Sequence, residues 1–189
     1  MYVLGIDVST SVTAYTLINT ECSQSDCLVK TEGIHLSKLS GIYNKADHVR
    51  EHFEKLAKEY DIEEIYIEEA LQSFRRGFSS AKTLSTLAMF NGIISYLAFK
   101  TFTDSEIALI NVIRARSSLG IKLNRKSDKN TKEQVFEWVQ KRKEFENFTW
   151  PTKVLKSGPR KGQEIFDKSC YDIADAAVMA MYGINLRAN

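Results

Sequence analysis

Two carboxylates lie three residues apart in a stretch of the chain that is otherwise small and apolar. Asp172 and Asp175 fall within the run SCYDIADAAVMA at residues 169–180, and side chains at this spacing share one face of a helix. The apolar neighbours indicate that this face packs against a core. Ionised carboxylates removed from water are costly unless they are paired, hydrogen-bonded or bound to a metal. The stretch therefore predicts a helix over residues 167–186 that carries a cation site.

A purely structural explanation covers only one of these two acids. Ser169 and Asp172 have the spacing of a capping box, and an acid in the first turn suits the helix dipole. Asp175 lies among alanines near the end of that turn, so capping does not explain it. A cation site at this helix thus requires acids from other segments.

Two other segments place acids where apolar strands end. Residues 2–9 and 12–19 are typical of a hairpin, with Asp7 at the end of its first strand; the alternative is that Asp7 caps the turn. A strand over residues 62–70 delivers Glu68 and Glu69 at its C-terminal end. Because strand side chains alternate between faces, only one of these two glutamates can join Asp7. Sites in open sheets gather beyond the carboxyl ends of parallel strands.

The remaining segments alternate between strand and helix, which indicates an α/β fold with five strands. The helix expected at 79–102 is apolar on most sides, as in a core helix or a subunit interface. We expect further strands at 27–36 and 107–113, further helices at 43–60 and 131–144, a basic loop at 114–130 and an extended basic loop at about 148–168.

Length and composition exclude several classes of protein. With 189 residues the chain is expected to form a single domain over residues 1–189. No apolar run is long enough to span a membrane, and the start MYVLGID lacks the basic region of a signal peptide, so we expect a cytoplasmic protein, whether its source is bacterial, viral or organellar. Cys22, Cys27 and Cys170 are odd in number and lack metal-ligand spacing, which predicts reduced thiols.

Positive charge is concentrated in one part of the chain, although the net charge is only +2. Lysines and arginines outnumber acids between residues 122 and 168, and the loop at 71–78 mixes aromatic residues with arginines, a combination that can stack on bases and contact phosphates. A solvated surface is the alternative for either segment. The candidate DNA-binding residues are Phe74, Arg75, Arg76, Arg114, Arg116, Lys122, Arg125, Lys126, Arg160 and Lys161.

The acids indicate which ion a site would hold. Three segments distant in sequence each contribute carboxylates at the end of an apolar element. Hard oxygen ligands suit Mg²⁺ or Mn²⁺, and a cluster of them can hold two ions that activate water and stabilise the departing oxygen in phosphodiester hydrolysis. His48 and His52 have a spacing that can bind a metal, but no cysteine accompanies them, so we expect a solvated face there rather than a zinc site.

In order and context, three motifs resemble those of RuvC-type Holliday junction resolvases of the RNase H-like superfamily. These are LGIDVST at 4–10, IEEA at 67–70 and DIADAA at 172–177. The run LAMFNGI at 87–93 is similar to the family's glycine-bearing central helix, and TKEQV at 131–135 to its lysine-headed helix. The resemblance implies an RNase H-like fold, with a central five-stranded mixed sheet flanked by helices. It also implies a homodimer formed through the 79–102 helix.

The same resemblance implies an activity and a set of site residues. The expected activity is that of a Mg²⁺-dependent endodeoxyribonuclease that resolves four-way (Holliday) DNA junctions by paired symmetric nicks. The family's catalytic acids carry over to Asp7, Glu68, Asp172 and Asp175, which would hold two Mg²⁺ or Mn²⁺ ions, and its active-site lysine to Lys132. The family register favours Glu68 over Glu69.

The chain departs from the family pattern in two places. Leu71 stands where family members place an aromatic wedge after the glutamate, with Phe74 three residues later. The segment at 148–168 is longer than in the short bacterial members. Two alternatives therefore remain: a broader nuclease for flaps, forks and three-way junctions, and a junction-binding protein of the same fold that does not cut.

Overall fold

A mixed five-stranded sheet forms the centre of the computed structural model, which describes residues 1–22, 27–70 and 81–187. The strand order is β3-β2-β1-β4-β5. The strand β2 is antiparallel to both of its neighbours, β1 and β3. The strands β4 and β5 are parallel to β1. The expected five-stranded mixed sheet is confirmed, with bounds β1 (Tyr2–Asp7), β2 (Val12–Asn19), β3 (Leu28–His35), β4 (Ile62–Glu68) and β5 (Glu106–Ile110).

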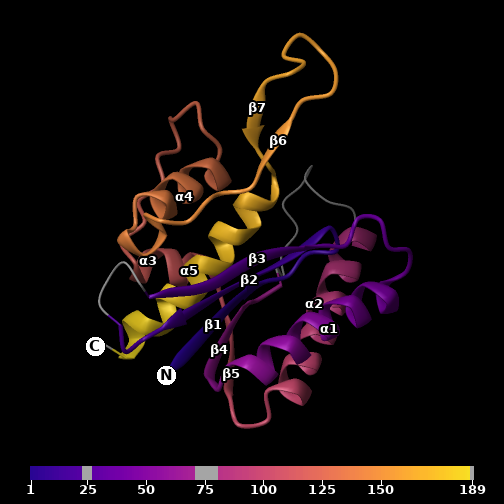
Figure 1. Cartoon of the computed structure of the whole chain (residues 1–189), viewed down its shortest axis with the longest axis vertical. Helices are drawn as coiled ribbons and strands as arrows, with labels where there is room; N and C mark the ends of the chain where they lie inside the picture. Colours follow the sequence, from indigo (N-terminus) through magenta and orange to yellow (C-terminus); the bar gives the residue numbers. More distant parts are fainter. Residues whose placement is uncertain (23–26, 71–80, 188–189) are drawn as a thin grey trace.

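Helices cover both faces of this sheet (Figure 1). One face carries α1 (Ile42–Glu59) and α2 (Ala81–Thr101). The opposite face carries α3 (Val112–Ser118), α4 (Thr131–Gln140) and α5 (Ser169–Arg187). A short 3-10 helix, η2 (Lys143–Phe145), follows α4.

Alternate residues of β1 belong to two separate cores. Leu4 and Ile6 pack with α1 and α2, whereas Val3 packs with α5. Gly5 lies so close to α5 that a Cβ atom at this position would be 2.2 Å from the backbone oxygen of Ala176. Because Gly5 has no side chain, α5 rests directly on β1, and Asp7, two residues further along the strand, faces the same helix.

Two elements differ from the expectation of loops. The segment at 114–130 overlaps the helix α3, which is capped by Asn111: its side chain accepts hydrogen bonds from the N–H groups of Ile113 (3.0 Å) and Arg114 (3.4 Å). The segment at 148–168 contains a separate hairpin, β6 (Thr152–Val154) and β7 (Glu164–Phe166). Both elements are short and charged, so they lack the long apolar pattern that identifies a strand or helix in a sequence.

The expectation of three reduced thiols is wrong for one pair of cysteines. Cys22 and Cys27 form a disulfide, with their Cα atoms 5.3 Å apart, whereas Cys170 is free and buried. Cys22 follows the end of β2 and Cys27 precedes β3, and the antiparallel pairing of these strands brings the two cysteines together. None of the helices in the described residues is long and apolar enough to cross a membrane.

Candidate metal centre

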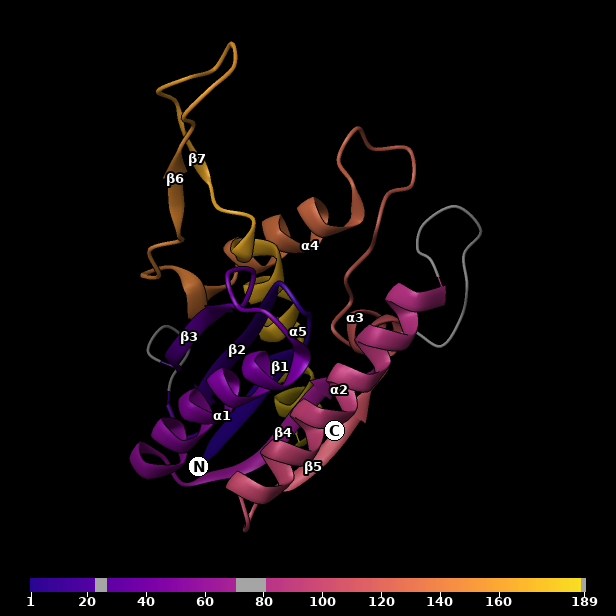
Figure 2. The same ribbon diagram turned by 90° about the vertical axis from the view of Figure 1, so that its right-hand side faces the viewer.

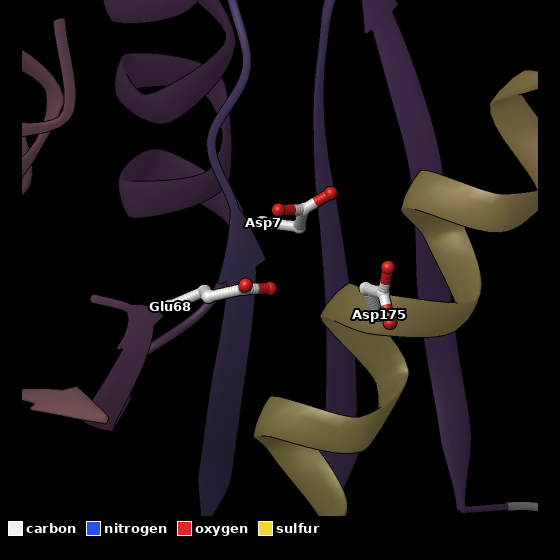
Figure 3. Close-up of side chains that lie close together, drawn as sticks. All are labelled: Asp7, Glu68 and Asp175. Atoms are coloured by element: carbon white, nitrogen blue, oxygen red, sulfur yellow. The ribbon is translucent and has the colours of Figure 1, made fainter. Parts of the chain in front are cut away.

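Three carboxylates from three elements converge at one edge of the sheet. Asp7 ends β1, Glu68 ends β4 and Asp175 lies in the second turn of α5 (Figure 3). One carboxylate oxygen from each residue lies within 4.8 Å of the other two. We call these three residues the acid cluster. Asp7 and Asp175 are buried, with exposed fractions of 8% and 3%.

The register of the sheet explains why the first two acids meet. The strands β1 and β4 are parallel and pair Ile6 with Ile67, so the next residues, Asp7 and Glu68, end side by side. Tyr66, two residues before Glu68, packs in the α5 core, and alternation therefore directs Glu68 to the α5 face and Glu69 to the other. The prediction that only one glutamate joins Asp7 is confirmed, and that residue is Glu68.

The turn after β1 does not need the carboxylate of Asp7. The hydroxyl of Ser9 accepts a hydrogen bond from the N–H of Val12 (3.0 Å) and donates one to the carbonyl oxygen of the same residue (2.8 Å). Ser9 therefore supplies the local hydrogen bonds that an acid could have made. This leaves the Asp7 side chain facing Glu68 and Asp175 rather than the turn.

Burial and crowding change how the acid cluster holds protons. Burial raises the pKa of Asp7 well above its ordinary value, and the charges of Glu68, Asp175 and Asp172 raise it further. Burial, followed by the charge of Asp175, raises the pKa of Glu68 to about 7, against the opposing charges of Arg116 and Lys132. A cluster that resists ionisation in this way gains most from a bound cation, which stabilises the ionised carboxylates.

Two cationic side chains border the acid cluster. The ammonium of Lys132 lies 2.9 Å from Asp172 Oδ1 and 3.9 Å from Asp175 Oδ2. A guanidinium nitrogen of Arg116 donates a hydrogen bond to Asp175 Oδ1 at 2.7 Å. Burial acts to lower the pKa of Lys132, but the nearby carboxylates, Asp172 above all, raise it to about 12. Both cations therefore partly neutralise the α5 side of the cluster.

Lys132 is positioned by the start of α4. The helix begins with a capping box, and Asn130 is its cap residue: the Asn130 side chain accepts from the N–H of Glu133, and the Glu133 carboxylate accepts from the N–H of Asn130. Lys132 is the second residue of the helix. The cap thus fixes the turn from which this lysine reaches α5.

Asp172 lies beside the acid cluster rather than within the group of three. Its carboxylate is 15% exposed and is held by Lys132. Burial raises the pKa of Asp172, although Lys132 opposes this effect. The capping explanation does not apply to Asp172, because the carboxylate of Asp167 accepts the hydrogen bond from the Ser169 N–H, at 2.9 Å.

Asn91 contributes to the site although the sequence did not identify it as functional. It is a buried residue of α2, and its amide donates a hydrogen bond to the backbone carbonyl of Glu68 at 2.8 Å. This contact fixes the end of β4 where the metal-ligating glutamate is expected. A polar residue in an apolar helix was the available signal, but its partner is 23 residues away in sequence.

The candidate DNA-binding residues divide into three groups. Arg116 is only 14% exposed and points to Asp175. Phe74, Arg75 and Arg76 lie outside the described residues, as does Leu71. The remaining ones are exposed on α3, on the segment between α3 and α4, or on the tip of the β6–β7 hairpin, and they are Arg114, Lys122, Arg125, Lys126, Arg160 and Lys161.

The donor set of the acid cluster fits a hard divalent cation. Three carboxylates offer only oxygen atoms, the ligands that Mg²⁺ and Mn²⁺ prefer. His and Cys, which dominate zinc sites, are absent from this cluster. The acid cluster could therefore hold a magnesium or manganese ion.

Comparisons with solved structures support the fold. No family model matches the chain, and no curated protein sequence does. The chain is similar to Thermus thermophilus RuvC in complex with a Holliday junction substrate, with a TM-score of 0.63 and 15% identity over 100% of this chain and 96% of that one. It is also similar to the yeast mitochondrial Holliday junction resolvase Ydc2, with a TM-score of 0.57 and 16% identity over 98% and 78% of the two chains. Fowlpox virus resolvase, solved with Holliday junction DNA, matches with a TM-score of 0.51 and 16% identity over the whole of both chains. The chain therefore has the RNase H-like fold of these resolvases.

Proposed function

We propose that this chain is a structure-selective endodeoxyribonuclease that resolves four-way DNA junctions by paired symmetric nicks. The observation that carries this proposal is the convergence of Asp7, Glu68 and Asp175 within 4.8 Å, on a fold that is similar to three Holliday junction resolvases. A fold alone does not fix an activity, so the acid cluster supplies the chemical argument.

The chemistry divides between the acids and the cations around them. Divalent ions bound at the acids, two of them in our proposal, would supply an activated water and stabilise the departing oxygen of the phosphodiester. Asp7, Glu68 and Asp175 would bind the metal from three sides, and Asp172 would complete the set from the first turn of α5. Lys132 lies where it would offset negative charge on the phosphate in the transition state.

The outer surface of α2 supports a homodimer. Met89, Tyr96 and Phe99 are 50%, 61% and 64% exposed on this helix, an unusual exposure for large apolar side chains. Paired nicks in a symmetric junction require two active sites related by a two-fold axis, which a homodimer provides. We therefore propose that α2 packs against α2 of a second copy.

A substrate panel tests the proposed function. The wild-type chain in Mg²⁺ is offered four-way junctions, three-way junctions, forks, flaps and linear duplex in competition, and we expect paired nicks in the four-way junction first. The variant Asp7→Asn should bind the junction without cutting it. Preferred cutting of flaps or forks would indicate the broader nuclease, and binding without cutting by the wild type would indicate a junction-binding protein.

A further inference from the structure

The β6–β7 hairpin takes no part in the chemistry described above. It forms its own two-stranded sheet and projects away from the central sheet (Figure 1). The second view, in Figure 2, shows that the hairpin extends from the same end of the molecule as the segment between α3 and α4. The chain passes from β7 into α5, so the hairpin rises from the end of α5 that carries Asp172 and Asp175.

Aromatic packing anchors the base of the hairpin. The ring of Phe136 on α4 contacts Trp150, which precedes β6, and Phe166, the last residue of β7, at centroid distances of 4.8 and 5.1 Å. Lys153 of β6 forms an ion pair with Asp167 at 3.2 Å, and Asp167 also caps the start of α5. The base is thus held between α4 and the start of α5, the helix that supplies Asp175, so the orientation of the hairpin is fixed relative to the acid cluster.

The tip of the hairpin is basic and internally hydrogen-bonded. Residues 155–163 have the sequence LKSGPRKGQ, which contains three cations and no acid. The backbone N–H of Gly162 donates to the carbonyl of Leu155 at 2.9 Å, and that of Lys161 to Gly158 at 3.0 Å. Gly158 and Gly162 adopt φ angles of 81° and 88°, which glycine reaches without strain. The tip therefore presents exposed Lys156, Arg160 and Lys161 on a shaped loop.

From these observations we infer that the hairpin tip binds the phosphate backbone of a duplex arm of the substrate DNA. The inference rests on the proposed function, because the DNA is placed by the acid cluster. About seven residues separate the base from the tip, a reach of at most about 23 Å at roughly 3.3 Å per strand residue.

Charge favours nucleic acid over other occupants of this surface. The three exposed cations lie in a tip that itself contains no acid, and they match a phosphate backbone. The first acid after them, Glu164, accepts a hydrogen bond from the hydroxyl of Thr152. A second copy of this chain, with its net charge of +2, offers no net negative charge to the tip. Phosphate contacts of this kind position DNA without reading its sequence. The hairpin would then hold the arm in a fixed orientation relative to α5.

The test compares two variants that each lose two positive charges. Arg160→Gln with Lys161→Gln removes charge from the tip, and Lys55→Gln with Lys58→Gln removes it from the exposed surface of α1. Affinity for a four-way junction is measured against salt concentration in Ca²⁺ or without metal. We expect the tip variant to lose roughly 10-fold in affinity at 100 mM salt and to lower the salt slope by about 2 for each protomer bound, with a change near zero in the control.

Hydroxyl-radical footprinting on the same complexes locates the contact. The tip variant should lose protection on the arms while it retains protection at the branch point, and its melting temperature should equal that of the wild type. Equal affinity, slope and footprint in the tip variant and the wild type would overturn the inference. The binding measurements do not depend on cleavage. A wild-type chain that binds junctions but never cleaves them would therefore contradict the proposed function, and the footprint would still show whether the hairpin tip contacts a DNA arm.

Discussion

The two faces of the central sheet are built from alternate residues of the same strands, yet only one of them buries carboxylates beside its apolar core. On the α1 and α2 face, β1 contributes Leu4 and Ile6 to a core of apolar side chains. On the α5 face the same strand contributes Gly5 and Asp7. Both faces gain stability from burial of apolar area, but the α5 face gives up side-chain volume at Gly5 so that an alanine-rich helix can bring an acid to the strand.

This difference predicts that packing changes on the two faces have different consequences. Gly5→Ala places a Cβ against backbone atoms of α5 that have no way to rotate aside, so we expect a loss of roughly 3 kcal/mol or more and displacement of Asp175. Leu4→Ala on the other face should cost a similar 2–5 kcal/mol through a cavity. Denaturant unfolding and Mn²⁺ affinity are the two measurements.

Only the Gly5 variant should lose metal affinity beyond what its stability explains. If Leu4→Ala weakens Mn²⁺ binding by the folded protein as much as Gly5→Ala does, metal binding does not depend specifically on packing at the α5 face.

Substitution of an acid should reverse the usual relation between stability and activity. Asp175→Asn relieves the crowding of the three acids but breaks the ion pair with Arg116, so the two effects oppose each other. We expect the stability of the metal-free protein to change by less than about 1 kcal/mol, while junction cleavage falls by at least about 1,000-fold. Ile6→Val on the opposite face is the matched control, with a loss of about 1 kcal/mol and cleavage retained. Cleavage at the wild-type rate by Asp175→Asn would show that this residue is not required for catalysis.

The pH dependence of stability should also come from the α5 face. Glu68 has a pKa of about 7 in the folded chain against 4.5 ordinarily, and the pKa of Asp7 is raised as well. The folded state therefore binds more protons than the unfolded state between these values, and the free energy of unfolding falls as pH rises through this window. From pH 5 to pH 7.5 we expect a loss on the order of 2 kcal/mol, or roughly 5 °C in melting temperature.

Calorimetry of the metal-free protein across this pH range checks the prediction. Asp7→Asn removes one titrating group and its charge from beside Glu68, so the fall should be smaller in this variant. A stability that rises with pH in the wild type, or an equal fall in Asp7→Asn, would show that the acid cluster is not the source.

A hydrogen bond that crosses between the faces offers the smallest and most specific test. Asn91 on α2 holds the backbone carbonyl of Glu68, so Asn91→Leu should weaken Mn²⁺ binding by about 5-fold and reduce stability by about 1 kcal/mol. Asn91→Asp offers no amide donor at this position and should weaken binding similarly. Unchanged affinity in both variants would remove Asn91 from the positioning of Glu68.

The sequence identified the acid cluster because its signals are local. Each signal lies within a few residues: an apolar strand ends in Asp7, a second strand ends in Glu68 and Glu69, and an apolar helix carries Asp175. The parallel pairing of β1 and β4 then brings the strand ends together.

The remaining contacts depend on tertiary approach between distant segments. Arg116 is 59 residues from Asp175 and reaches it only because α3, a seven-residue helix, packs beside α5. The sequence does not distinguish this arginine from its exposed neighbour Arg114, and it therefore predicts that both bind DNA. The β6–β7 hairpin was equally hidden, because three-residue strands carry too few side chains to show an alternating pattern.

The division between the two faces is tested most directly by locating the metal. Crystals soaked in Mn²⁺ are measured at a wavelength where manganese scatters anomalously, and the peak positions are compared with the acid cluster. We expect a peak coordinated by Asp7, Glu68 and Asp175, at about 2.2 Å from their oxygens, that disappears in Asp7→Asn. Manganese bound elsewhere, with the three carboxylates unliganded at saturating concentration, would contradict the proposal that the α5 face is a metal-dependent nuclease centre.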